Sequence, residues 1–400
     1  MIKSLLKFCF LFTLLFSGSV LYSQNGVNLN QGGTQQKHYY TVIPYKEVKS
    51  KVIVQCTING KPHNFIVDTG AAMSITTKLF NELQPDVIAQ MRLSDQAGML
   101  DSLQMVSLKN IKIGDVTFNN IPTAVVKDSE IFDCFEVDGL IGSNLLRNSI
   151  IQFSSKTHTV TLTDDPKKLA LKSKYASRMQ LTAVQSNPFI WIEATNGEIG
   201  GRDNVLFDSG MDGFYDLSMN AFQQTFAPIN LFTVLAQAKG SFTWGLNGVP
   251  LAQDYYKVSV PQLKINGSTF KNVTSETTYG DSSRIGANLF NHGLVTLDYK
   301  NKKFYFEPFA KTNFDLQTYD WPFTPSIKNN KLVVGIVWGE RWREIIIPDD
   351  EIIEFDGKVY EDADICNIIT SNHKTINARA KLVLKDAATG EIKEVEISKE

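Results

Sequence analysis

The chain has 400 residues, of which 40 are basic and 42 acidic, so its formal net charge is only −2. No block of a single sign interrupts this balance, which argues against nucleic acid and against an anionic membrane as partners. The length predicts two or three domains, and an apolar content of 43% is enough for ordinary globular cores.

The first 23 residues predict a secretory signal peptide. Lys3 and Lys7 precede an apolar stretch at 8–16, and small residues follow that stretch. It is too short to span a bilayer, so we expect a periplasmic or secreted protein with no transmembrane segment once the signal is removed. The segment 24–37 is rich in Gln, Asn and Gly and predicts a disordered leader.

An apolar run that ends in a carboxylate, a hydroxyl and a glycine occurs twice. Residues 65–70 read FIVDTG, and residues 205–210 read VLFDSG. Three apolar residues predict a buried strand, and the glycine allows a tight turn behind the Asp. A single copy would also suit a surface turn, because Asp and Gly are common turn residues.

Further segments match in the same order after each copy. Residues 112–121 (KIGDVTFNNI) correspond to 264–273 (KINGSTFKNV), and 139–146 (GLIGSNLL) correspond to RIGANLF at 284–290. Chance could supply one such match, but an ordered series predicts that residues 40–310 are two copies of one unit that face each other.

These motifs resemble the pepsin and retropepsin clan of aspartic proteases. In that clan each lobe supplies one Asp-Thr-Gly or Asp-Ser-Gly, and a later apolar-apolar-Gly segment threads past it. The resemblance implies an all-β dominated fold with two pseudo-symmetric lobes, at 38–166 and 167–310. The sequence departs from the pattern by a first flap without tyrosine and by two mild substitutions, Ser209 for Thr and Arg284 for the first apolar residue of the second threading segment.

The resemblance assigns catalysis to Asp68 and Asp208. Two carboxyl groups within hydrogen-bond distance share one proton, because like charges raise the pKa of one of them. The ionised partner would take a proton from water while the other donates to a peptide carbonyl oxygen. Thr69 and Ser209, with Gly70 and Gly210, would support this dyad through cross-lobe hydrogen bonds and tight turns.

We therefore expect an aspartic endopeptidase that acts on a peptide or protein substrate without a cofactor or metal. The alternative is a catalytically silent two-lobed peptide-binding protein. Around the expected cleft, the polar hairpin 92–104 centred on Gly98 is interpreted as the flap. Trp244 is either a substrate-facing aromatic or cross-strand packing, and Asp212 is either a turn residue or a carboxylate lining the cleft.

The last part of the chain, 311–400, has no counterpart in the duplication. Residues 348–358 resemble the Gly-Asp-x-Ile-x-x-x-Asn-Gly segment of PDZ domains, and 323–326 would stand where that family has its carboxylate-binding loop, without its glycines. The resemblance implies a small PDZ-like α+β domain that captures a peptide C-terminus; the alternative is a sheet domain that only packs on the lobes. We expect it to be dispensable for the dyad chemistry.

Three cysteines remain after the signal peptide: Cys56, Cys134 and Cys366. They allow at most one intrachain disulfide. We expect three buried free thiols, with a Cys56–Cys134 bridge as the alternative because both lie in the first copy. No Cys and His spacing indicates a zinc site.

Overall fold

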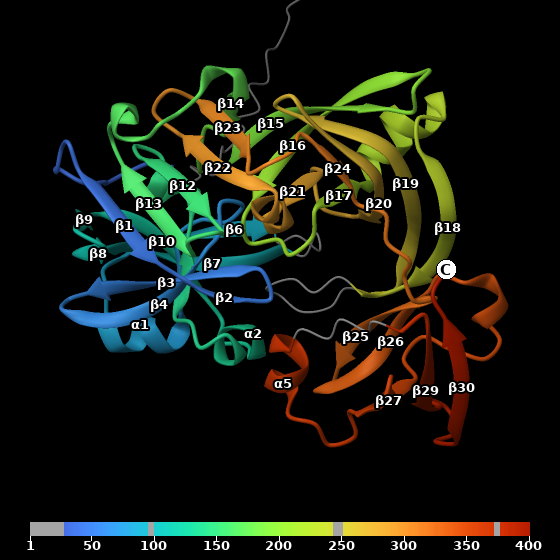
Figure 1. Ribbon diagram of the computed structural model, residues 1–400. Coiled ribbons are helices and arrows are strands. Elements are labelled where there is room, and N and C mark those ends of the chain that lie inside the picture. The colour runs from blue at the N-terminus through green and yellow to red at the C-terminus, as the bar shows by residue number, and fades with distance from the viewer. Residues whose placement is uncertain (1–27, 95–99, 243–250, 372–376) are drawn as a thin grey trace, which may run out of the picture.

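The computed structural model describes residues 28–94, 100–242, 251–371 and 377–400. Strands dominate it (Figure 1), in sheets of ten, fourteen and six strands among the described residues. The prediction of an all-β dominated fold is confirmed. None of the described helices combines the length and the apolar character needed to cross a membrane.

We call the part built on the ten-stranded sheet the first lobe. The sheet runs in the order β6 (Val87–Ser94), β7 (Leu100–Leu108), β10 (Ile121–Val126), β5 (Ser74–Thr76), β11 (Gly139–Ile141), β4 (Lys61–Val67), β3 (Lys51–Ile58), β8 (Ile111–Ile113) and β9 (Val116–Phe118), with β2 (Lys46–Val48) on β3. Its helices are α1 (Thr77–Leu83), α2 (Glu130–Cys134) and α3 (Ser143–Leu146).

The fourteen-stranded sheet begins with strands from the first half of the chain and continues into the second lobe. Its order is β1 (Tyr40–Pro44), β13 (Thr159–Thr163), β12 (Ile150–Ser154), β22 (Gly293–Asp298), β23 (Lys303–Pro308), β14 (Ala176–Leu181), β15 (Pro188–Thr195), β16 (Gly200–Asp208), β21 (Arg284–Gly286), β17 (Tyr215–Ser218), β20 (Ser268–Thr278), β19 (Gln253–Ile265) and β18 (Thr233–Gly240), with β24 (Asn313–Asp315) on β20. Short helical turns accompany it: η1 (Pro166–Lys168), η2 (Ser173–Tyr175), α4 (Met219–Ala221), η3 (Phe222–Phe226), η4 (Ala227–Ile229) and η5 (Ala287–Asn291).

The C-terminal domain carries the six-stranded sheet. The sheet comprises β25 (Phe323–Lys328), β26 (Lys331–Val337), β27 (Glu351–Phe355), β29 (Arg379–Lys385) and β30 (Ile392–Ser398), with β28 (Lys358–Val359) on β27; its helices are η6 (Glu340–Trp342) and α5 (Ile365–Thr370). Residues 323–326 belong to β25 and pair with β26. The expectation that they form a carboxylate-binding loop is wrong, because they pair with β26 as part of the sheet.

The two lobes share one strand arrangement around the repeated motif. In the first lobe, β11 lies between β4 and β5, so that Leu140 is opposite Ile66 on one side and Ser74 on the other. In the second lobe, β21 lies in the same way between β16 and β17. Antiparallel pairing of β12 with β22 joins the lobes, with Ile150 opposite Asp298.

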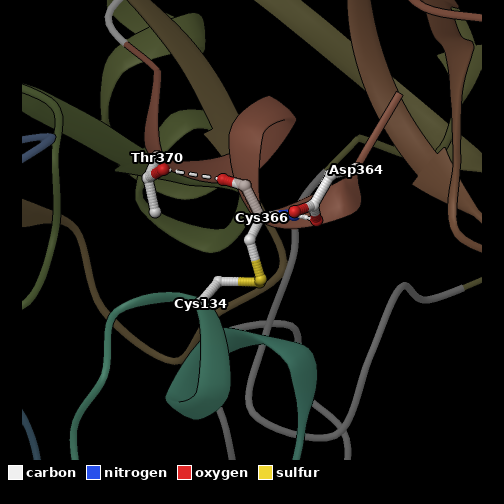
Figure 2. Close-up of a disulfide and its surroundings, with 4 residues drawn as sticks. All are labelled: Cys134, Asp364, Cys366 and Thr370. Carbon is white, nitrogen blue, oxygen red and sulfur yellow. Dashed lines mark hydrogen bonds between the residues drawn. A yellow bond between two sulfur atoms is a disulfide. The ribbon is translucent and has the colours of Figure 1, made fainter.

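One disulfide bond links the first lobe to the C-terminal domain. Cys134 of α2 is bonded to Cys366 of α5 (Figure 2), and Cys56 is buried as a free thiol. Both expectations from the sequence, three free thiols or a Cys56–Cys134 bridge, are wrong. The bonded residues are 232 positions apart, so their approach depends on the packing of α2 against α5, which has no local signal in the sequence.

The C-terminal domain contacts both lobes. Ile369 of α5 shares an apolar cluster with Phe132 and Phe135 of the first lobe. Trp338 shares another with Tyr255 of β19. The apolar side chains of α5 are therefore already covered, and a peptide C-terminus binding beside α5 would have to displace this contact.

The polar leader is structured from residue 28 onward, which corrects the expectation of disorder there. Leu29 is fully buried with Ala72, Met105 and Ala124, and its N–H donates to the carbonyl of Val184. The polar composition of 24–37 does not indicate this packing, because it depends on the side chain of one residue, Leu29. The predicted signal peptide lies outside the described residues.

Candidate active site

Asp68 directly follows β4, whose last three residues, 65–67, are buried. Its N–H donates to Ile141 of the threading segment, 3.0 Å away. Its carboxyl Oδ1 accepts hydrogen bonds from the N–H groups of Gly70 and Ala71, at 2.9 and 3.0 Å. The turn behind β4 therefore holds the carboxyl group in one orientation.

Asp208 occupies the matching position in the second lobe. It ends β16 and lies opposite Gly286 of β21. Its Oδ1 accepts from the N–H of Gly210 at 2.9 Å. The residue is buried, with 6% of its surface exposed.

The two carboxyl groups face each other across the lobe boundary, each beside the glycine of the other lobe's motif. Each presses on that glycine: a Cβ added at Gly210 would lie 2.3 Å from Oδ2 of Asp68, and one at Gly70 would lie 2.7 Å from Cγ of Asp208. Real side chains do not tolerate such distances. Gly70 and Gly210 are thus required for this close approach.

Thr69 and Ser209 connect the two turns across the lobe boundary. The Thr69 hydroxyl donates to Phe207 O at 2.6 Å and accepts from the Ser209 N–H at 3.0 Å. The Ser209 hydroxyl donates to Val67 O at 2.8 Å and accepts from the Thr69 N–H at 3.0 Å. Both side chains are fully buried, so these four bonds fix the relative position of the two Asp residues.

The environment favours one shared proton on this pair. Burial raises the pKa of Asp68 to about 7, and the negative charge of Asp208 acts in the same direction. The ammonium group of Lys51 opposes both effects. At neutral pH the Asp68 carboxyl is therefore close to the midpoint of its titration.

Lys51 is a residue near the pair that the sequence reasoning missed. Its Nζ donates to the carbonyl of Gly210 and forms an ion pair with Asp212, whose side chain is half exposed. Asn187 stands at the matching place before β15 and donates to the carbonyl of Gly70 at 2.7 Å. The available signal was positional, since each residue stands at the start of the strand that pairs with the strand leading to the Asp of its own lobe.

Arg284 is not the mild substitution that the sequence suggested. Its guanidinium donates to Asp208 Oδ2 at 3.3 Å and to Asp216 Oδ2 at 2.6 Å. It is 7% exposed. A single buried cation therefore joins one carboxyl group of the pair to a third carboxylate on β17.

Other predicted site features are only partly described. The strands of the proposed flap form an antiparallel hairpin, with Met91 opposite Leu103, whereas Gly98 and Trp244 both lie outside the described residues. Across the described ranges, no group of three or more His, Cys, Asp or Glu side chains could hold a metal ion.

Comparison with known proteins identifies part of this arrangement. A search of curated proteins finds no match to the chain. Residues 54–145, which run from β3 through Asp68 to the threading segment and α3, match the family model described as aspartyl protease.

Proposed function

We propose that the protein is a secreted or periplasmic aspartic endopeptidase that hydrolyses peptide bonds with water activated by Asp68 and Asp208. The observation that carries the proposal is the close approach of these two carboxyl groups, one from each copy of the duplicated motif, with each packed against the glycine of the other copy. The family match over 54–145 supports the protease class. The signal-like residues 1–23 support the location outside the cytoplasm.

The chemistry follows from a pair that holds one proton. The ionised carboxylate accepts a proton from water as the water oxygen bonds to the peptide carbonyl carbon. The protonated carboxyl donates to the carbonyl oxygen, which gives a neutral tetrahedral diol. When the C–N bond breaks, the leaving nitrogen takes a proton from one carboxyl group while a hydroxyl of the diol gives its proton to the other. The products are a carboxylic acid and an amine, and the pair again holds one proton. No covalent enzyme intermediate is needed.

The surroundings support this role through rigidity. Four buried hydrogen bonds at Thr69 and Ser209 hold the turns, and backbone N–H groups orient both carboxyl groups. A preorganised acid and base spend no energy on reorganisation during the reaction. A catalytically silent binding protein would not need both carboxyl groups in contact, because their repulsion lowers stability.

The test is proteolysis by purified full-length protein. A denatured protein mixture is incubated at acid and neutral pH, with and without a transition-state mimic that carries a central hydroxyl. We expect cleavage that the mimic inhibits and that Asp68→Asn and Asp208→Asn each reduce more than about a hundredfold, the effect of losing a positioned acid or base. Lys61→Gln, on an exposed lysine paired with Glu82, is the control. Binding of the mimic without any cleavage would favour the silent binding protein.

A further inference from the structure

The two lobes differ in charge at one position beside the carboxyl pair. In the first lobe, Leu140 of the threading strand lies opposite Ser74 of β5. In the second lobe, the same ladder position places Arg284 opposite Asp216 of β17. The backbone arrangement is repeated, but an apolar and a neutral side chain are replaced by a cation and an anion.

We infer that Arg284 breaks the symmetry of the pair: it holds the negative charge on Asp208, which becomes the general base, and leaves the shared proton on Asp68, which becomes the general acid. This inference rests on the proposed endopeptidase function for the words acid and base. The charge distribution itself rests only on the contacts of Arg284.

The contacts are one-sided. Arg284 Nη1 lies 3.3 Å from Asp208 Oδ2, and its Nη2 lies 2.6 Å from Asp216 Oδ2. Arginine stays protonated in proteins, and both Arg284 and Asp208 have side chains only 9% exposed. Little water screens the attraction, so it acts mainly on the ionised form of Asp208.

Asp216 holds the guanidinium in place and also competes for it. Burial raises the pKa of Asp216, and the charge of Arg284 opposes that rise. Removing the negative charge of Asp216 therefore leaves the whole cationic field of Arg284 to Asp208. Arg284 and Asp216 are thus expected to have opposite effects on the ionisation of the pair.

Other charges near the pair do not supply the same asymmetry. Lys51 acts on Asp68 rather than on Asp208, and its ion pair with Asp212 is more exposed to water than the ion pair of Arg284 with Asp216. The titratable groups whose charges reach Asp68 or Asp216 also include Asp212, Tyr215, Glu276 and Tyr299.

The consequence is a pH profile that depends on Arg284. A cation beside a carboxylate lowers the pH at which the first proton leaves the pair, by about 1–3 units for an adjacent arginine. Activity requires the singly protonated pair, so Arg284 extends activity toward acid pH. Replacing Arg284 should move the acid limb of the profile upward.

The test compares two variants that should shift in opposite directions. Arg284→Leu combined with Asp216→Ser restores the first-lobe pattern without leaving a lone buried carboxylate. We expect the acid limb of the pH profile of kcat/KM to move to higher pH by about one unit or more. At pH values below the limb, kcat/KM should fall about tenfold. Asp216→Asn keeps Arg284 and should move the limb down. A purely structural role would lower kcat in both variants without moving either limb, and that result overturns the inference.

A second measurement separates this inference from the proposed function. Carbon-13 NMR of Asp-labelled full-length protein follows the carboxyl titrations without turnover, with Asp68→Asn and Asp208→Asn used for assignment. We expect Asp208 to ionise at lower pH than Asp68 in the wild type. In the double variant the difference between these two pH values should become smaller. If this holds and no peptide is cleaved, the proposed function fails and the charge assignment stands. If peptides are cleaved and this difference does not change, the charge assignment fails.

A separate observation concerns the face of the first lobe that carries Asp68. Side chains two residues apart on a strand share a face, so Ile66 projects on the same side as Asp68. Ile66 pairs with Ile53 and with Leu140, and all three are at most 5% exposed. Their apolar cluster also contains Ile369 of α5.

The second lobe lacks this cover. By the same ladder, Leu206 and Phe189 correspond to Ile66 and Ile53, and both are only half-buried. The C-terminal domain therefore contributes apolar side chains to the first-lobe cluster that holds Ile66, together with Phe132 and Phe135 of the first lobe itself. Figure 1 shows α5 next to α2, the helix that the disulfide holds.

We propose that the C-terminal domain is an autoinhibitory cover for the first-lobe half of the substrate surface, locked by the Cys134–Cys366 bond. This proposal also depends on the endopeptidase function. We expect a peptide that extends over Ile66 and Leu140 to displace Ile369 of α5 from the apolar cluster that these residues share, and the bond makes that displacement costly. Asp364 caps α5 through the Cys366 N–H at 2.8 Å, which keeps Cys366 directed at α2 (Figure 2).

The test opens the cover in the full chain. Cys134→Ser with Cys366→Ser should raise the rate of peptide cleavage about fivefold or more, the usual size of coupling between sites. It should also speed hydrogen exchange in α5. A dithiol reductant, itself oxidised to a disulfide, should have the same effects on the wild type and none on the double variant. Ile369→Ala weakens the contact with the bond intact and should act in the same direction.

Hydrogen exchange in α5 and the rate of peptide cleavage together decide the outcome. Faster exchange in α5 without a faster rate, in protein that keeps its wild-type circular dichroism, shows that α5 does not obstruct substrate and overturns the proposal. Unchanged exchange in both variants shows that neither the bond nor Ile369 holds the domain, which also overturns it. Faster exchange in a protein that cleaves nothing, even when opened, refutes the endopeptidase function and with it the inhibitory role.

Discussion

Replacing Asp68 by Asn should stabilise the protein at neutral pH, although it abolishes the proposed chemistry. In the folded protein, burial and the charge of Asp208 raise the pKa of Asp68 from 3.8 to about 7. In the unfolded chain the group keeps its ordinary pKa. Below pH 4 both states are protonated and the carboxyl costs nothing. Between pH 4 and 7 only the unfolded state ionises freely, so the wild type loses stability as the pH rises.

The size of the loss follows from the shift. One pKa unit corresponds to 1.36 kcal/mol, so a shift of about three units amounts to up to about 4 kcal/mol above pH 7. Asparagine has no charge to bury and should avoid this loss. The difference in unfolding free energy between Asp68→Asn and the wild type should therefore grow from pH 4 to pH 7 and then level off.

The assay is urea unfolding of both proteins at several pH values from 4 to 8, read by tryptophan fluorescence. Asp86→Asn, on an exposed carboxylate paired with Lys109, is the matched control and should show little pH dependence relative to the wild type. A difference that is flat across this range, or that shrinks as the pH rises, would show that Asp68 is not buried against another negative charge.

Three further predictions concern the surroundings of the pair. Thr69→Val removes a hydroxyl that satisfies Phe207 O and the Ser209 N–H, and should lower the unfolding free energy by about 2–4 kcal/mol, whereas Thr69→Ser keeps the hydroxyl and should cost much less; urea unfolding checks this. Lys51→Met removes a cation that lowers the pKa of Asp68, so the alkaline limb of the kcat/KM profile should move to higher pH, while Lys61→Met should leave it in place. Gly210→Ala would place a methyl group 2.3 Å from Asp68 Oδ2 and should reduce peptide cleavage more than about a hundredfold; a variant with near wild-type rate would contradict the tight contact.

The parts that could be predicted from sequence are those with local or repeated signals. The hairpin between β3 and β4 follows from Asn59-Gly60, which adopts positive φ at both residues. The strand–turn motifs at Asp68 and Asp208 repeat with their threading segments in a fixed order. Each such feature lies within a few residues of its own signal, so pattern alone could place it.

The parts that could not be predicted depend on contacts between distant segments. Cys134 and Cys366 approach only because α2 packs against α5. Lys51 reaches across the lobe boundary to Gly210. Arg284 was visible as a departure from the motif, but its partner Asp216 is defined by the register of β17 against β21. The pattern of polar and apolar residues along the sequence does not reveal how two distant strands are aligned.

The duplication explains why charge, rather than backbone, distinguishes the two halves of the site. A two-fold scaffold presents two equivalent carboxyl groups, yet the proposed reaction needs one acid and one base. The family match covers only the first copy, where Leu140 leaves Asp68 without a cation on its own threading strand. The second copy carries the buried pair of Arg284 and Asp216. A buried ion pair is costly in a protein core, but here it can assign different roles to two otherwise equivalent Asp residues. The opposite pH shifts expected for the Arg284 and Asp216 variants measure this effect directly.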